Sequence, residues 1–222
     1  MTCLAVDTTA DFGSIALANE EGVCEEVLVH APQGFSRVLF GEIEGLLVRQ
    51  KVRLAEIDLF AGASGPGSFT GVRVGLSAIK GLAEVLGKQV VAVSNLEALA
   101  EFGTSAARAT IIDARRGEVF GAVYSDAGRP IVPEVVLPFG KFLGLLPAID
   151  VEWIAQDFES FRPLLAGTRF ELSRVVKAPA AMAAAITRIA MRRAAAGSAQ
   201  NPAAIEANYV RRSDAELLFK TT

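Results

Sequence analysis

The first third of the chain alternates short apolar runs with polar turns. CLAV at residues 3–6 ends at Asp7, SIALA at 14–18 leads to an acidic turn with Gly22, and VCEEVLV follows at 23–29. Apolar runs of this length, bounded by turn residues, are typical of β-strands joined by short connections. The pattern therefore predicts an antiparallel meander of three strands.

Two amphipathic helices are predicted next, one on each side of a buried strand. Helical spacing predicts a helix over residues 36–50, with Ser36 as its N-cap. Its apolar positions are Phe35, Leu39, Ile43, Leu46 and Leu47. The continuous apolar run at 57–64 predicts the strand, and helical spacing returns over 70–86. The apolar positions of this second helix are Val74, Ala78, Leu82 and Val85. A strand over 90–94 and a short helix over 95–102 complete this half.

The second half of the chain repeats the opening pattern. Residues 109–128 align with residues 3–22, because each segment has an apolar run ended by Asp, a short turn with Gly and a second apolar run. The matched residues Asp7 and Asp113 are 106 positions apart, about half of the 222-residue chain. A repeat at this offset indicates two related lobes, although strand–turn–strand patterns also arise by coincidence. Weaker patterns predict helices over 141–146, 160–167 and 178–193, a strand over 151–156 and an irregular polar tail.

Composition places the chain among globular proteins with a substantial core. The chain is 51% hydrophobic and 21% charged, which fits one large domain or two small lobes. A net charge of −3 argues against a protein that binds nucleic acid alone through overall basicity. Two cysteines exclude a disulfide scaffold, and we expect both to be reduced. The opening residues do not resemble a signal peptide, and no apolar run reaches the roughly 20 residues of a membrane span, so we expect a cytoplasmic protein with no membrane contact.

The stretch GPGSFTG at residues 65–71 joins a predicted strand to a predicted helix, a place where many proteins hold phosphate. A phosphate-binding P-loop has Lys and then Ser or Thr after its last glycine, but Val72 and Arg73 follow Gly71 here. The glycines also miss the dinucleotide-binding spacing G-x-G-x-x-G by one residue. Two interpretations remain: the helix N-terminus binds an anion, or the glycines let two backbones approach closely. The side chains favour the second.

Side chains suited to catalysis are sparse. His30 is the only histidine, so a two-histidine metal site is impossible, and Ser68 or Thr70 lacks a nearby base for a catalytic triad. Asp7 and Asp113 could hold Mg²⁺ if the lobes face each other, or each could end a strand and bond its own turn. We therefore expect no reaction by this chain alone. The candidate nucleotide-contacting residues are Asp7, Thr8, Thr9 and Asp113.

Three segments together resemble one protein family. They are AVDTTADFGSIAL at 5–17, GPGSFTGVRVGLSAIKGLA at 65–83 and IDARRGEVFGAVY at 112–124. In order and spacing they are similar to the bacterial tRNA threonylcarbamoyladenosine biosynthesis protein TsaB family, also called YeaZ. Two places depart from the family pattern. Phe35-Ser36 stands where a His-Ser pair often opens the first helix, and residues 207–211 lack the proline of a Pro-x-Tyr-Leu-Arg tail.

The resemblance implies the α/β actin-like ATPase (ASKHA) fold, with two related lobes that each hold a mixed five-stranded sheet and helices. We expect these lobes at residues 1–102 and 103–222, with partner-docking helices in the first. The resemblance also implies a non-catalytic partner or scaffold subunit of the complex that forms N6-threonylcarbamoyladenosine in tRNA next to the anticodon. There the related protein TsaD holds a metal through paired histidines and performs the transfer, and the ATPase TsaE binds the pair.

The same resemblance sets expectations for ligands and assembly. We expect no cofactor to be required by this chain alone, with ATP or ADP and metal held by the partner subunit. We expect contact with tRNA only through the complex, and a homodimer is an alternative assembly for the isolated chain. The lone histidine fits a relative that lacks the metal-binding pair, so the chain is expected not to be an enzyme.

Pairs of glycines four residues apart mark the two predicted helices of the first lobe. Glycine inside a helix costs about 1 kcal/mol relative to alanine, so we expect close helix contact as compensation. Such a face packs either inside its own lobe or against another protein, and the resemblance favours a four-helix arrangement with TsaD. The predicted interface residues are Ser36, Gly41, Gly45, Phe69, Gly71, Arg73, Gly75 and Ala78.

Another class of function stays open at this point: an ATP-dependent small-molecule kinase, or a nucleotide-sensing module, of the actin-like superfamily. A kinase requires a catalytic Asp and two phosphate loops. Asp7 and Asp113 with their turns are the available candidates, and Arg115 and Arg116 fill the second turn with bulk. ATP titration of the chain with and without its relative separates these classes.

Overall fold

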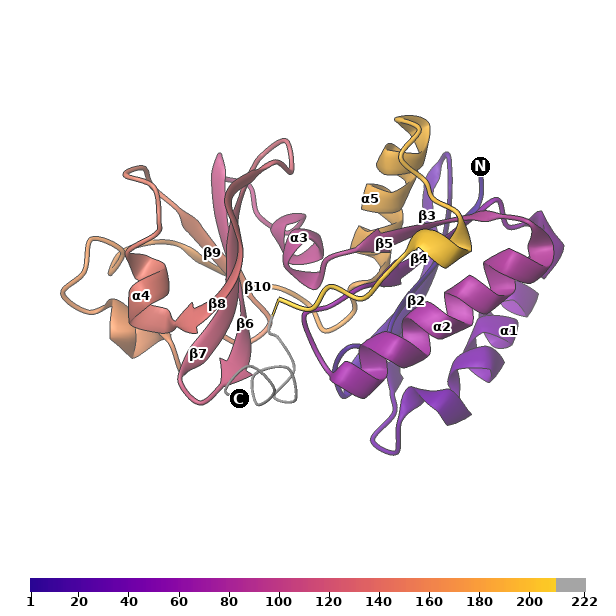
Figure 1. The fold of residues 1–222 in the computed structure, drawn as a ribbon, viewed down its shortest axis with the longest axis horizontal. Helices are drawn as coiled ribbons and strands as arrows, with labels where there is room; N and C mark the ends of the chain where they lie inside the picture. The colour runs from indigo at the N-terminus through magenta and orange to yellow at the C-terminus, as the bar shows by residue number, and fades with distance from the viewer. Residues whose placement is uncertain (211–222) are drawn as a thin grey trace, which may run out of the picture. The chain divides into compact units, whose positions relative to one another are not determined.

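The computed structural model describes residues 1–210, and the predicted tail from residue 211 onward lies outside the described residues. The chain forms two compact units, which we call the first and second lobes. The first combines residues 1–98 with 179–207, and the second combines residues 99–178 with the chain from Asn208. Each lobe is built on one five-stranded sheet (Figure 1).

The sheet of the first lobe has the strand order β3–β2–β1–β4–β5. Its strands are β1 (Cys3–Asp7), β2 (Phe12–Asn19), β3 (Gly22–His30), β4 (Leu59–Ala63) and β5 (Gln89–Val93). The first three form the predicted antiparallel meander, whereas β4 runs parallel to β1 and β5 runs parallel to β4. The sheet is therefore mixed, as predicted.

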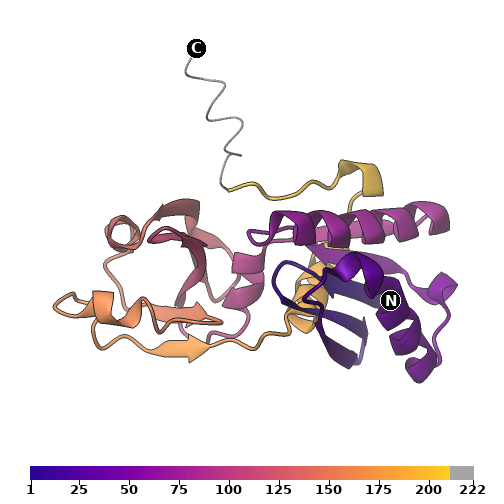
Figure 2. The same cartoon turned by 90° about the horizontal axis from the view of Figure 1, so that it is seen from below.

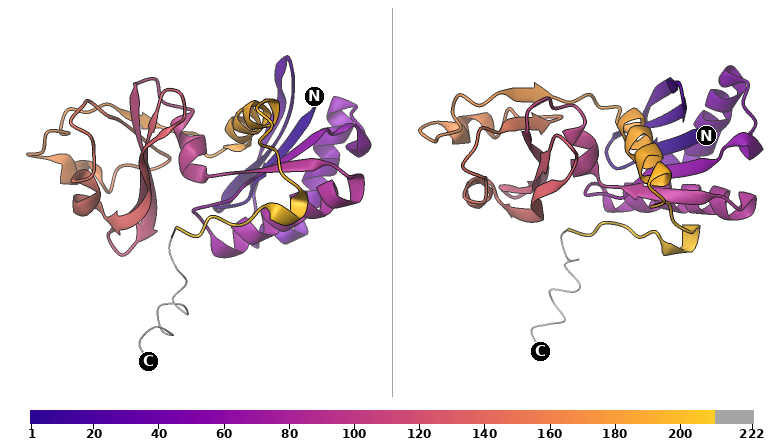
Figure 3. Two further views of the ribbon diagram at one scale, coloured as in Figure 1. Left: turned by 45° about the horizontal axis from the view of Figure 1, so that its top comes forward. Right: turned by 90° about the horizontal axis from the view of Figure 1, so that it is seen from above.

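The helices of the first lobe pack on both faces of this sheet. Side chains alternate between the two faces along each strand, and the two faces differ in side-chain size. Leu4 and Val6 point into an apolar cluster shared with α1 (Leu39–Gln50) and α2 (Phe69–Leu86), which lie side by side (Figures 1 and 2). The opposite face of β1 and β2 carries small residues: Cys3, Ala5, Ala16 and Ala18. Because small side chains permit close approach, the Ala-rich helix α5 (Ala183–Ala195) packs on that face (Figure 3).

The predicted helix boundaries and faces need two corrections. Ser36 lies in a short 3-10 turn (Phe35–Arg37), and α1 begins at Leu39 with no side-chain cap, so Ser36 is not its N-cap. In α2 the buried apolar positions are Val72, Leu76, Ala78, Ile79 and Ala83. Of the predicted set, Ala78 is buried, and Val74 and Leu82 are only partly buried. Val85 is 86% exposed, because the glycine-bearing side of α2 packs on the sheet instead.

The second lobe repeats the sheet of the first. Its strand order is β10–β9–β6–β7–β8, with β6 (Ala107–Arg115), β7 (Glu118–Ser125), β8 (Pro130–Pro138), β9 (Glu152–Ala155) and β10 (Val175–Lys177). Counted from the first strand of each lobe, the two orders are the same, which confirms the repeat. Strand β8 was not predicted, because three prolines interrupt its pattern; it forms a sheet edge, where proline is tolerated.

Aromatic side chains fill the core of the second lobe. Trp153 is fully buried, as its place in a predicted strand suggests, and contacts the rings of Phe139, Phe142, Phe158 and Phe170. The helices here are short: α4 (Phe139–Leu143), a 3-10 turn (Arg162–Leu165) and α3 (Asn95–Ala100), which lies across the boundary between the two units. Within residues 1–210, none of the helices combines the length and apolar character needed to span a bilayer.

Helix α5 is anchored to the first sheet through its N-terminus. Ser14 Oγ accepts hydrogen bonds from the backbone N–H groups of Met182 at 2.9 Å and Ala183 at 2.8 Å. Glu26 Oε1 accepts a third from Ala184 N–H at 2.8 Å. Side chains from β2 and β3 therefore satisfy N–H groups that the helix itself leaves unpaired.

The chain after α5 also belongs to the first lobe. Gln200 exchanges two backbone hydrogen bonds with Val90 of β5, and Ile205 is buried in the cluster with α2. The expected second lobe at residues 103–222 is therefore corrected: residues 179–207 complete the first lobe, because its sheet offers α5 a face of small residues.

Candidate functional site

The turn that follows β1 is buried and holds three of the four residues predicted to contact a nucleotide. Asp7 is 3% exposed, and its Oδ1 accepts hydrogen bonds from Thr9 N at 2.9 Å and Thr9 Oγ1 at 2.6 Å. Asn95 Nδ2 donates to Thr9 Oγ1 at 2.7 Å. Burial raises the pKa of the Asp7 carboxyl, and the hydrogen bonds from Thr9 and Asn95 oppose that rise. The structure thus brings Asp7, Thr8 and Thr9 together in a closed network.

The glycine-rich loop packs directly against this turn. Ser68 N donates to the carbonyl oxygen of Thr9 at 2.7 Å, and Thr8 Oγ1 donates to that of Gly71 at 2.7 Å. A Cβ on Gly67 would lie 2.6 Å from the Thr9 carbonyl oxygen, and one on Gly71 would collide with that of Thr8. These contacts support the interpretation that the glycines let two backbones approach closely.

Asn95 is a component of this network that the sequence analysis missed. Its side-chain Oδ1 accepts a hydrogen bond from Gly65 N at 3.0 Å, and its backbone N–H donates to the Gly65 carbonyl oxygen at 2.9 Å. One side chain therefore joins the start of the glycine loop to Thr9. The available signal was an Asn placed directly after an apolar strand.

Three residues of α2 that were predicted to contact a partner face their own lobe. Gly71, Gly75 and Ala78 are all buried. A Cβ on Gly75 would lie 2.5 Å from Thr8 Oγ1. The prediction that these residues form an interface is therefore corrected: the space they leave is occupied by the turn after β1 and by the sheet.

The outer surface of α1 and α2 carries exposed apolar side chains among polar ones. It carries four large side chains: Phe40, Val48, Phe69 and Val85, which are 56%, 70%, 51% and 86% exposed. Gly41 and Gly81 lie on the same surface, and a Cβ at either would meet open space. The Arg73 guanidinium lies 3.8 Å from the centre of the Phe69 ring. We call these seven residues the α1–α2 surface.

The α1–α2 surface keeps only part of the predicted interface. Gly41, Phe69 and Arg73 belong to it, and Ser36 is exposed in the 3-10 turn before α1. Gly45 is half-buried, and a Cβ there would lie 3.3 Å from Arg49 Nη1. Phe40, Val48 and Gly81 were not among the predicted interface residues, and Val85 had been assigned to the apolar face of its helix by spacing.

Asp113 occupies the equivalent turn of the second lobe. Its Oδ1 accepts a hydrogen bond from Arg115 N at 2.7 Å, just as Asp7 Oδ1 accepts one from the residue two positions later. Asp113 is exposed, whereas Asp7 is buried. The fourth candidate nucleotide contact is therefore a turn-forming carboxylate on the surface of the second lobe.

His30 lies at the end of β3 and stacks on an aromatic neighbour. Its ring centre is 4.3 Å from that of Phe12, with 14° between the planes. Both side chains are exposed. His30 is therefore a surface residue, as its place at a strand end suggests.

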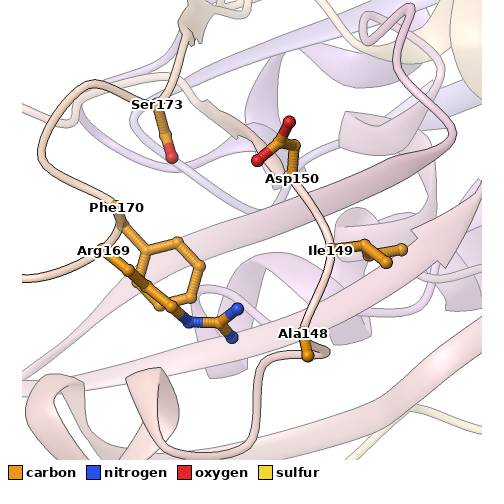
Figure 4. Close-up of a pocket in the computed structure, with 6 residues that line it drawn as sticks. All are labelled: Ala148, Ile149, Asp150, Arg169, Phe170 and Ser173. Atoms are coloured by element: carbon orange, nitrogen blue, oxygen red, sulfur yellow. The ribbon is translucent and has the colours of Figure 1, made fainter.

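A pocket in the second lobe contains none of the predicted site residues. It is lined by Ala148, Ile149, Asp150, Arg169, Phe170 and Ser173 (Figure 4). Arg169 Nη2 donates to the carbonyl oxygens of Leu146 at 2.9 Å and Pro147 at 2.6 Å. This arginine therefore ties two loops together, a structural role that explains its position.

Comparison with known proteins identifies relatives over most of the chain. Residues 28–212 match the family model described as TsaD: tRNA N6-adenosine threonylcarbamoyltransferase. The tRNA threonylcarbamoyladenosine biosynthesis protein TsaB of Bacillus subtilis is 36% identical over 155 residues, 68% of each chain. The protein of the same name from Escherichia coli is 34% identical over 128 residues, 56% of this chain and 55% of the relative.

A solved structure supports the same relationship. YeaZ from Pseudomonas aeruginosa has 25% sequence identity and a TM-score of 0.79, and the match covers 94% of this chain and 99% of that one. With the repeated five-stranded sheets, this likeness confirms the predicted actin-like fold. The chain belongs to the TsaB (YeaZ) family of tRNA threonylcarbamoyladenosine biosynthesis proteins.

Proposed function

We propose that this chain is a non-catalytic partner subunit that supports TsaD in forming N6-threonylcarbamoyladenosine on tRNA. It docks on TsaD through the α1–α2 surface, and TsaE binds the resulting pair. The partner subunit supplies the metal and the ATP or ADP. The observation that carries the proposal is the exposed apolar surface of α1 and α2 in a protein of this family.

The shape and chemistry of the α1–α2 surface suit two helices of another protein. Phe40 and Val48 on α1, and Phe69 and Val85 on α2, are large apolar side chains that are all exposed. Where such side chains form one patch, the patch marks an interaction site in soluble proteins. Gly41 and Gly81 add no side chains, so a partner helix can approach the backbone there. A four-helix arrangement buries all of these positions at once.

Several features support a non-catalytic role for the buried turn. Asp7 Oδ1 already accepts two hydrogen bonds from Thr9, and Thr8 is enclosed by the glycines of α2. These groups hold the glycine loop and the turn together, which gives each of them a structural task. We therefore propose that the isolated chain performs no transferase, ATPase or peptidase reaction.

The docking proposal is tested by placing a charge on the surface without disturbing the fold. Val85→Glu puts a carboxylate where 86% of the side chain is exposed, so the lobe should stay folded. Desolvating that charge in the interface should weaken pairing with TsaD at least tenfold, a loss of about 1.4 kcal/mol or more. Calorimetric titration of purified TsaD with each variant measures the change.

Leu172→Glu is the matched control, because Leu172 is 96% exposed in the second lobe. This control should pair like the unaltered chain. Equal affinity for both variants would refute docking through α1 and α2. Sedimentation of the isolated Val85→Glu chain shows in addition whether the same surface supports a homodimer.

A further inference from the structure

We propose that the β6–β7 turn, residues 113–118, contacts the phosphate backbone of RNA. The identity of that RNA as tRNA rests on the proposed function. The turn presents two adjacent arginines, Arg115 and Arg116, in a backbone conformation that arginine rarely adopts. This contact is direct, whereas the resemblance implied contact with tRNA only through the complex.

The backbone of the turn is unfavourable for the residues it carries. Arg115 and Arg116 have φ values of 66° and 57°, followed by Gly117 at 76°. Tight hairpin turns with positive φ values favour Asn-Gly or Gly-Gly, because Cβ crowds the backbone in this region. Asn at position 116 would therefore suit the fold better than Arg. Residues held in such conformations are concentrated at functional sites.

The arginine side chains add little to the fold that would offset this conformation. The Arg115 side chain is 87% exposed, and its Nη1 lies 3.6 Å from Asp113 Oδ2, a loose surface pair. Arg116 is exposed and forms no hydrogen bond or ion pair through its side chain with any of residues 1–210. Two guanidinium groups are thus presented to solvent from adjacent positions.

The turn after β1 in the first lobe provides a comparison, because it is largely buried and packed against its own lobe. There the positions that match Arg115 and Arg116 are Thr9, which is buried beside the glycine loop, and Ala10, which is exposed. In the second lobe Asp113, Arg115, Arg116 and Gly117 are all exposed. The two turns therefore share the carboxylate that shapes them, but the second has exposed arginines where the first has the enclosed Thr9 and the small Ala10.

Two exposed guanidinium groups at adjacent positions are well suited to bind the oxygens of a phosphate group. Guanidinium groups form paired hydrogen bonds to phosphate and stay charged at every physiological pH. Asp113 Oδ1 accepts the Arg115 backbone N–H and so shapes the turn, and its Oδ2 makes only the loose pair with Arg115 Nη1 at 3.6 Å. With a net charge of −3, the chain lacks a broad basic surface, so the contact is local and involves few phosphates.

The test uses a substitution at position 116 that should suit the turn but remove the contact with phosphate. Arg116→Asn creates the preferred Asn-Gly turn, so the thermal unfolding midpoint should stay the same or rise. If Arg116 contacts one phosphate, affinity for an unmodified tRNA that reads codons beginning with A should fall about tenfold at 50 mM salt. The slope of log K against log salt concentration should fall by about 1. Fluorescence anisotropy of labelled tRNA with the full chain measures both.

Arg129→Asn is the control, because Arg129 is an exposed arginine in the β7–β8 turn of the same lobe. It removes the same charge, and it should leave the affinity and the salt slope unchanged. Equal losses in the two variants would show that only overall charge matters and would overturn the proposal. An unchanged affinity in Arg116→Asn, or no binding of tRNA by the unaltered chain, would also overturn it.

Pairing with TsaD is measured separately by gel filtration of the same variants. If the unaltered chain fails to pair but Arg116→Asn still weakens tRNA binding, the proposed function fails and the RNA contact stands. If pairing is intact and tRNA binding does not respond, the RNA contact fails alone. Loss of TsaD pairing with unchanged tRNA binding would assign the turn to a protein partner and refute the RNA assignment.

Discussion

The first strand of each lobe ends at an aspartate that accepts a hydrogen bond from its own turn, yet the two turns have opposite surroundings. In both, an aspartate side chain accepts a hydrogen bond from the backbone N–H two residues later. In the first lobe the 18-residue helix α2 follows β4 and encloses the turn; the equivalent connection in the second lobe contains only a four-residue 3-10 turn. The turn after the first strand is therefore part of the buried core in one lobe and part of the exposed surface in the other.

The largest expected effect comes from filling the space between α2 and the first turn. Gly71→Val places a side chain against the Thr8 backbone, where a Cβ alone would already collide with the Thr8 carbonyl oxygen. We expect the free energy of unfolding to fall by about 3 kcal/mol, at the upper end of the usual overpacking cost. Denaturation by urea, followed by circular dichroism, measures the change.

Gly75→Leu also fills the space between α2 and the first turn. It tests in addition the prediction from the sequence that Gly75 lies at the interface with TsaD. The structure leads us to expect loss of stability, because the Cβ alone would lie 2.5 Å from Thr8 Oγ1. A stable Gly75→Leu chain with weakened TsaD pairing would restore the interface interpretation and contradict the enclosure of the turn by glycines.

A smaller effect on stability is expected from the carboxyl group of Asp7, which is buried, whereas the matching carboxyl group of Asp113 is exposed. Burial raises the pKa of Asp7, so the folded state favours the protonated form. This contribution to stability is present below the pKa of the unfolded chain and is lost as pH rises through the higher pKa of the folded state. Asp7→Asn should therefore remove the part of the stability that the unaltered chain loses as pH rises above the pKa of an aspartate in the unfolded chain.

Asp113→Asn is the matched control for this pH dependence, since the carboxylate of the second turn is exposed. Urea denaturation of the three chains at a series of pH values provides the comparison. If Asp7→Asn and the unaltered chain lose stability in parallel as pH rises, another group causes the dependence.

The smallest effect should come from a glycine that nothing encloses. Gly81 lies on the outer side of α2, and a Cβ there would meet open space. Gly81→Ala should raise the free energy of unfolding by up to about 1 kcal/mol through helix propensity alone. Thermal denaturation measures it, and a loss of stability would mean that the outer side of α2 is packed in the isolated chain.

Much of the fold could be predicted because strands, turns and the repeat leave local signals. The meander, both major helices of the first lobe and the equivalence of Asp7 and Asp113 all follow from patterns within about 20 residues. The side of α2 that is buried could not be predicted in this way. Val85 and Val72 have equal hydrophobicity, and the choice between them depends on where Thr8 lies in three dimensions.

The candidate site shows the same limit. The residues of the first turn were identified, but their roles depend on partners far away in the sequence, such as Asn95 for Thr9. Gly71 and Gly75 of α2 were correctly taken as positions of close approach, but the wrong neighbour was assigned to both. Sequence spacing reveals that a contact is tight without revealing what makes it.

The placement of α5 has a consequence for the order in which the protein is made. The first lobe begins at the N-terminus, but its small-residue face is covered only when residues 183–195 have been synthesised. At typical translation rates, about 5–20 s separate the last strand of that sheet from the end of α5. The contiguous part of the second lobe, residues 99–178, emerges from the ribosome within that interval. The first lobe is therefore completed only after residues 99–178 have been synthesised, and nascent chains pass through a stage in which α5 does not yet cover the small-residue face of the sheet.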